Sequence, residues 1–208
     1  MAYDLEEQEQ LDELKTWWKH NGSMVLGVVA AALIAFAGFK GWSYYQHKQT
    51  LEASVQYEAL SRLTVKDIDK IRTISGQIME QYSGTPYAGR AALLAAKANY
   101  AAKNVKSAKA QLEWVVGHAK EDAVRAIGQL QLAAIQLEEK AYDAALKTLG
   151  EKHDAAYDGL FADLRGDVLA AQGKKNEARA AYQEALLKLD AEGHYRNYTQ
   201  HKLDALGS

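Results

Sequence analysis

The fold is decided by the stretch ADLRGDVLAAQGKKNEARAAYQEAL, residues 162–186. Within it, Gly166 precedes Ala178 by twelve positions, and the bulky Tyr182 follows four positions later. Small residues let two crossing helices approach closely, and a large side chain fills the hole beside the crossing. Gly173 falls between the two helical segments, where the chain must turn. This stretch therefore predicts a pair of antiparallel helices.

The same pattern of small, small and bulky residues occurs twice more upstream. One copy has Ala96, Ala108 and Leu112, and the other has Ala133, Ala145 and Leu149. The alanine at the second position of the pattern recurs after 37 and then 33 residues, which is the period of a tetratricopeptide array. An ordinary helical bundle would also contain periodic alanines. We expect a stack of helix pairs, capped by a last helix near residues 195–206.

Composition favours helices along the whole chain. The 208 residues contain one proline, Pro86, and no cysteine, so disulfides and thiolate sites are excluded. Residues 50–62 and 66–82 have helical spacings of apolar residues. In the segment that follows, Gly84 suits a helix end, Thr85 an N-cap and Pro86 the first helical position.

The N-terminal part contains a candidate membrane anchor. Residues 23–39 read SMVLGVVAAALIAFAGF and contain no charge. They would span roughly 25 Å as a helix, slightly less than the hydrocarbon core of a bilayer. Aromatic residues flank the run on both sides, as in an interfacial belt: Trp17, Trp18, Trp42, Tyr44 and Tyr45. The fold class is therefore all-α, with a single N-terminal transmembrane helix followed by a tetratricopeptide-like helical repeat (α-solenoid) domain.

Two other interpretations of this run are a buried soluble helix and a cleaved signal peptide. The acidic leader of 22 residues and the aromatic cluster after the run favour a retained anchor. We predict an acidic tail (1–22), an anchor with its interfacial belt (23–45) and a repeat domain (46–208). Lysines near the two ends of the span are equal in number, so charge does not orient it. Gly27, Ala31 and Ala35 form a stripe of small residues that suits packing against another membrane helix. Alternatively, the stripe reflects only that small residues are common in membrane spans.

No pattern in the chain points to catalysis. Its six histidines lack metal-ligand spacing with acids, and there is no phosphate loop and no Gly-x-Ser-x-Gly motif. The formal net charge is −2, without a basic run, which argues against nucleic-acid binding. We therefore expect a protein that is not an enzyme and has no cofactor or metal, and an unrecognised active site is the least favoured alternative.

A repeat stack offers a concave groove lined by the first helix of each pair. The repeat spacing assigns the following residues to it: Arg90, Leu93, Lys97 and Tyr100; Ile127, Leu130, Ala134 and Leu137; Leu160, Asp163, Asp167 and Ala170. The groove would be cationic at one end, apolar in the middle and acidic at the other, which suits an extended or helical peptide. Alternatively, Leu93, Leu130 and Leu137 belong to the core between helices.

Several features occur in a characteristic order along the chain: an acidic leader, Trp17-Trp18, a Gly-rich anchor, the exit Trp42-Ser43-Tyr44, and the stretches AALKTL (144–149) and FADLRG (161–166). In this order they resemble the YfgM family, the ancillary subunit of the bacterial SecYEG translocon. The resemblance covers essentially the whole chain.

The resemblance implies a single-pass protein of the bacterial inner membrane, with its N-terminus in the cytoplasm and its repeat domain in the periplasm. It implies partners beyond membrane lipid: the SecYEG translocon, a PpiD-like membrane-anchored periplasmic chaperone and exported client polypeptides. The expected function is a non-enzymatic interaction module that handles exported proteins. A structural adaptor or regulator in another cell-envelope complex is the alternative, and the architecture alone does not separate the two.

Overall fold

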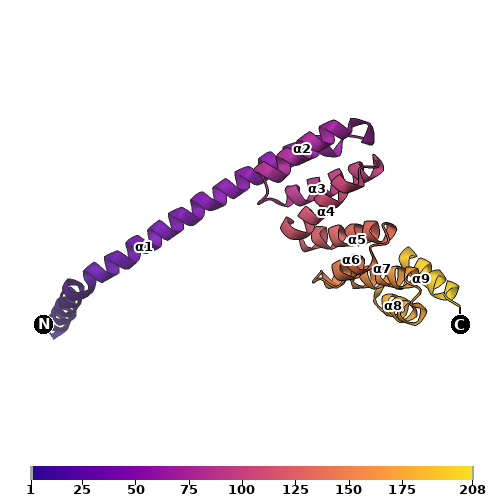
Figure 1. The fold of residues 1–208 in the computed structure, drawn as a ribbon. Helices are drawn as coiled ribbons and strands as arrows, with labels where there is room; N and C mark the ends of the chain where they lie inside the picture. The colour runs from indigo at the N-terminus through magenta and orange to yellow at the C-terminus, as the bar shows by residue number, and fades with distance from the viewer. Residues whose placement is uncertain (1, 208) are drawn as a thin grey trace. The chain divides into compact units, whose positions relative to one another are not determined.

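The computed structural model describes the backbone of residues 2–207 and the side chains of residue 7 and residues 9–207. Met1, Ser208 and the side chains of Asp4 and Glu6, which belong to the predicted terminal segments, lie outside the described residues. The described chain is helical, without strands (Figure 1). Its elements are α1 (Ala2–Ser61), η1 (Val65–Asp67), α2 (Ile68–Gln81), α3 (Pro86–Ala101), α4 (Val105–His118), α5 (Asp122–Glu138), α6 (Tyr142–Leu149), η2 (Ala155–Tyr157), α7 (Asp158–Ala171), α8 (Lys175–Lys188) and α9 (His194–Ala205).

The chain forms two compact units, residues 1–48 and residues 49–208. The first consists of α1 up to Lys48, and α1 continues into the second unit, where it ends at Ser61. In the second unit Leu60, at the end of α1, packs with Ile71 and Ile78 of α2 and with alanines of α3. The finer boundaries expected at residues 22 and 45 stay predictions.

Three helix pairs follow, α3 with α4, α5 with α6, and α7 with α8, stacked in chain order (Figure 1). All nine residues of the predicted repeat pattern are buried: Ala96, Ala108, Leu112, Ala133, Ala145, Leu149, Gly166, Ala178 and Tyr182. A Cβ atom on Gly166 would overlap the ring of Tyr182. The small residues thus lie where two helices cross, as the sequence predicted, and the all-α repeat fold is confirmed.

The three turns inside the pairs share one backbone conformation. Gly173, in the last turn, has φ +77°, and Lys103 and Lys140 occupy the same place in the first two turns with φ 62° and 60°. In the last turn the amide of Lys174 donates to the carbonyl of Leu169 at 2.9 Å, the six-to-one bond that ends a helix in a Schellman motif. The sequence predicted the turn at Gly173. In the other two turns a lysine adopts the same left-handed conformation.

The segment before the first pair differs in detail from the expectation. The predicted helix 66–82 is divided into η1 and α2, and α2 ends at Gln81. Thr85 is the N-cap of α3 and Pro86 its first residue, as predicted. The Thr85 hydroxyl accepts no bond from the helix and donates one to the carbonyl of Tyr82 at 2.8 Å. Thr85 therefore joins α3 to the end of α2.

A buried amide connects α2, α3 and α4. Asn99 of α3 is fully buried, and its Oδ1 accepts a bond from Arg72 Nε of α2 at 2.8 Å. Its Nδ2 donates to Gln111 Oε1 of α4 and to the carbonyl of Ala95, both at 3.0 Å. A buried polar group is tolerated only when its bonds are made, so Asn99 selects one arrangement of these three helices.

Candidate protein-binding groove

The end of the predicted groove on α3 is hydrogen-bonded to α5. Arg90, Lys97 and Tyr100 are exposed. Arg90 donates two hydrogen bonds to the carboxylate of Glu121, at 2.7 and 2.6 Å, and Tyr100 donates one to the carboxylate of Glu138. These bonds raise the pKa of Arg90 and the pKa of Tyr100. Because Glu121 neutralises Arg90, the positive charge predicted here rests mainly on Lys97.

The residues predicted to form the middle of the groove are apolar and half-buried. Ile127, Leu130, Ala134 and Leu137 of α5 and Leu93 of α3 all keep part of their surface exposed. Leu130 and Leu137 also pack against the core cluster that α5, α6 and α7 share, and Leu93 packs against the clusters around α4. The leucines therefore contribute to the core and to the surface at once, which leaves a stripe of apolar surface along α5.

The end of the predicted groove on α7 is joined to α9 by ion pairs and hydrogen bonds. Lys202 Nζ lies 2.7 Å from Asp163 Oδ2 and 2.7 Å from Asp167 Oδ2. Thr199 donates to Asp163 Oδ1 and Tyr182 donates to Asp167 Oδ1, both at 2.8 Å. The Asp163 side chain is only 13% exposed. The two aspartates predicted to form an open acidic end are thus covered and paired by the last helix.

The pKa values of this cluster reflect its burial. Burial raises the pKa of the Asp167 carboxyl, although the bonds from Lys202 and Tyr182 oppose the rise. Burial by itself would lower the pKa of Lys202, but its bonds to Asp163 and Asp167 outweigh burial, and the pKa is raised. The ammonium group of Lys202 therefore stays charged at neutral pH and neutralises much of the negative charge at this end of the groove.

Two tyrosines beside Lys202 were not among the residues that the sequence assigned to the groove. Tyr195 and Tyr198 are 63% and 68% exposed on α9. Together with Lys202 they repeat the spacing of Leu160, Asp163 and Asp167, each 35 residues later in the chain. Leu160 and Ala170 are half-buried on α7. The 35-residue spacing is a signal that could have found the two tyrosines, but α9 lacks the small-residue mark of the other repeats.

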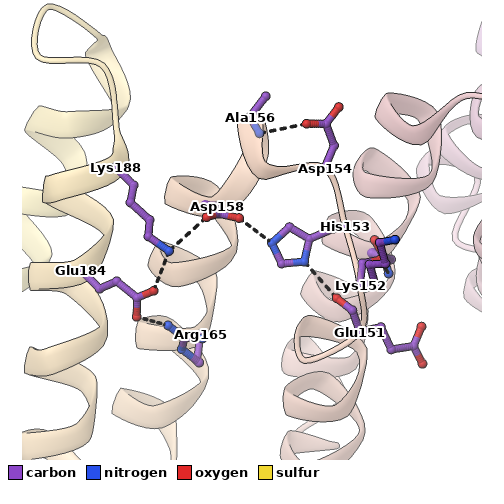
Figure 2. A network of polar contacts seen from close by, with 10 residues as sticks. Glu151, Lys152, His153, Asp154, Ala156, Asp158, Arg165, Glu184 and Lys188 are labelled. Carbon is purple, nitrogen blue, oxygen red and sulfur yellow. Dashed lines mark hydrogen bonds and ion pairs between the residues drawn. The ribbon is translucent and has the colours of Figure 1, made fainter.

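A polar network lies where the second pair meets the third (Figure 2). Lys188 of α8 lies 3.0 Å from Asp158 and 3.0 Å from Glu184, and Glu184 also pairs with Arg165 of α7. On the other side of Asp158, His153 Nε2 lies 3.1 Å from its carboxylate. The hydrogen bond from Lys188 lowers the pKa of Asp158 and contributes to raising the pKa of Lys188 itself. The network joins α7, α8 and the α6–α7 connection.

A cavity of about 280 Å³ opens beside this network. Its lining residues are Asp122, Arg125, Lys152, His153 and Asp154. Arg125 pairs with Asp122 and donates to the carbonyl of Ala119, and Asp154 accepts a bond from the amide of Ala156. The lining contains no serine, threonine or cysteine that could serve as a nucleophile, and His153 pairs with Asp158. Among the described residues no three His, Asp or Glu side chains are placed to hold a metal.

Helix α1 is long and apolar enough to cross a membrane. Its large apolar side chains in the first unit, such as Leu33, Ile34 and Phe36, are exposed, so they are not part of this chain's core. Gly27, Ala31 and Ala35 are also exposed, and a Cβ atom on Gly27 would meet no other atom. The structure of the described residues therefore leaves the predicted helix-packing stripe accessible.

Comparison with known proteins identifies a matching family model and several relatives of this chain. A family model described as a tetratricopeptide repeat-like domain matches residues 15–208. A protein of Neisseria gonorrhoeae is 30% identical over 211 residues, covering 99% of this chain and all of that protein. A protein of Haemophilus influenzae is 30% identical and one of Escherichia coli is 28% identical, covering 89% and 96% of this chain and 91% and 96% of those proteins. All three are called ancillary SecYEG translocon subunits. No solved structure matches this chain significantly.

Proposed function

This chain belongs to the YfgM family of ancillary SecYEG translocon subunits, and we propose that it acts beside the Sec translocon as a membrane-anchored interaction module without catalytic activity. The observation that supports this most strongly is the apolar stripe of Ile127, Leu130 and Leu137 on a stack of repeats that is joined to an apolar anchor. Arg90, Tyr100, Asp163 and Asp167 pair with residues outside the groove set. The remaining groove residues apart from Lys97 present apolar surface, and none of the set forms a catalytic arrangement.

The ligand of the groove is an exported polypeptide or the segment of a periplasmic chaperone of the PpiD kind. A half-buried apolar stripe gains free energy when a partner covers it, at roughly 25 cal/mol per Å² of apolar surface removed from water. Repeat stacks bind extended or helical segments in this way, with alternating side chains held in successive hollows. Lys97 at one end would orient such a segment by its charge.

In this proposal the groove lies in the periplasm and the N-terminal tail in the cytoplasm, which is the orientation that the family resemblance implies. Gly27, Ala31 and Ala35 pack against a membrane helix of a partner, because small residues allow two helices to approach closely in a bilayer. A reporter enzyme active only in the periplasm, fused after Ser208, tests the orientation. Activity of that fusion supports it, and activity only of a cytoplasmic reporter at the same place would reverse it.

Affinity capture from gently solubilised bacterial membranes tests the association. We expect the full-length protein to retain SecYEG, and the variant Gly27→Ile/Ala31→Ile to retain much less. Leu33→Ile is a matched control, since it changes an exposed apolar residue of the same helix without adding bulk to the stripe. Capture of a different envelope complex in place of SecYEG would contradict the proposal and favour a structural adaptor.

A further inference from the structure

The last helix borders the groove. Thr199, which is 1% exposed, faces the repeat stack, and Leu203 and Leu206 pack against the cluster of α7 and α8. Lys202 lies at the edge of this buried face and reaches Asp163 and Asp167, two residues assigned to the groove face of α7. The side of α9 that contains Lys202 therefore continues the groove beyond α7.

Tyr195 and Tyr198 lie on that side of α9. Residues three, four and seven positions apart share one face of a helix, so both rings are on the same face as Lys202. They are 63% and 68% exposed, whereas the apolar residues in the middle of the groove are half-buried. The groove thus ends in two accessible aromatic side chains.

The charged residues at the α9 end of the groove do not favour binding of a basic polypeptide segment. Asp163 and Asp167 would attract a lysine or arginine of the ligand if they were unpaired. Both aspartates bind Lys202, however, and most of each side chain is buried. What remains for a ligand is the apolar body and the hydroxyl group of each tyrosine. Tyrosine provides a large contact area with only two side-chain torsions to fix, and it is enriched among the residues that dominate binding energy.

We propose that Tyr195 and Tyr198 form the C-terminal end of the groove and bind an uncharged aromatic or aliphatic part of an unfolded polypeptide. This role rests on the function proposed above, because it requires that the groove bind polypeptides. It makes the last helix, which would otherwise serve only as a cap on the stack, part of the binding surface. The segment bound in the groove would run from Lys97 across the stripe on α5 to the tyrosines.

Fluorescence anisotropy with the full-length protein in lipid nanodiscs tests this role. The probes are three labelled peptides of equal length: one neutral and rich in aromatic and aliphatic residues, one basic and one acidic. We expect the neutral peptide to bind most tightly to the wild type. Tyr195→Ala/Tyr198→Ala should weaken it by about tenfold or more, because tyrosine is among the residues that contribute most to binding energy. Asn197→Ala, an exposed change on another side of α9, should leave the affinity within about twofold.

Lys202→Gln provides a second arm. It removes the charge that neutralises Asp163 and Asp167, so the basic peptide should gain affinity severalfold. Tight binding of the neutral peptide that the double tyrosine variant leaves unchanged would overturn the role of α9 and leave the groove function in place. Preference of the wild type for the basic peptide would overturn it as well. If none of the peptides binds the wild type, the proposed function itself fails, and the role of α9 fails with it.

Discussion

Replacing Gly166 by alanine places a methyl group against the ring of Tyr182. The added Cβ would overlap ring atoms of Tyr182, which is buried and cannot swing away because its hydroxyl donates to Asp167 at 2.8 Å. Overpacking of this kind costs up to about 3 kcal/mol. Alanine recovers about 1 kcal/mol through its higher helix propensity. We expect Gly166→Ala to destabilise the third pair by about 2 kcal/mol.

The first two pairs show how the clash can be relieved. They combine alanine with leucine at these positions, as Ala96 with Leu112 and Ala133 with Leu149. Tyr182→Leu alone loses ring packing and the bond to Asp167, which together amount to about 2–3 kcal/mol. In Gly166→Ala/Tyr182→Leu the third crossing resembles the other two. The double variant should therefore be more stable than the sum of the single changes by about 2 kcal/mol.

Hydrogen exchange measured by mass spectrometry on the full-length protein gives these free energies separately for each helix pair. A coupling of about 2 kcal/mol corresponds to about a 30-fold change in the protection of the amides of α7 and α8. Ala180→Gly/Lys175→Ala, on α8 away from the crossing, provides a pair of changes that should add without coupling. Additivity of the Gly166 and Tyr182 changes within about 0.5 kcal/mol would refute the close crossing of α7 and α8.

Three further changes test separate features of the repeat domain. Asn99→Ala should destabilise α2, α3 and α4 by about 2–3 kcal/mol, because it breaks three bonds around a buried amide; hydrogen exchange confined to these helices checks it, and unchanged protection would contradict it. Lys140→Gly should raise the free energy of unfolding by about 0.5–1 kcal/mol, since glycine adopts φ 60° without strain; a lower melting temperature would disagree. Asp158→Asn should destabilise the protein near neutral pH. The difference in free energy of unfolding between the variant and the wild type should shrink as the pH falls below about 4, because the folded-state pKa of Asp158 lies below its unfolded value and its stabilisation is lost on protonation. Melting curves in which this difference does not depend on pH would count against it.

The helix pairs could be predicted because their signals are local. Gly166, Ala178 and Tyr182 mark a crossing that needs two small residues and a filler, and Gly173 marks a turn with positive φ. These requirements act within one repeat, so they leave a period in the sequence. The same reasoning did not find the left-handed turn at Lys140, because lysine has no special preference for that conformation and is held there by the two helices around it.

The ends of the groove could not be predicted as well as its middle. Asp163 and Asp167 look like an open acidic surface in the sequence, but their partner Lys202 lies 39 and 35 residues away. Long-range pairs of this kind depend on how a helix docks, and α9 has no alanine pattern that would reveal its orientation. For the same reason the sequence predicts only that Tyr195 and Tyr198 belong to a helix that caps the stack. The partial burial of Leu130 could not be predicted from the sequence, because a leucine at this position fits both the core and the groove.

Photo-crosslinking from the groove in intact membranes tests the central proposal most directly. A photoreactive amino acid at Ile127, on the apolar stripe, is compared with one at Lys147, which is exposed on the second helix of the same pair. While a protein is being exported, we expect adducts with that polypeptide or with a periplasmic chaperone from position 127 and few from position 147. Equal labelling from both positions, or none from position 127 while export proceeds, would contradict a polypeptide-binding groove.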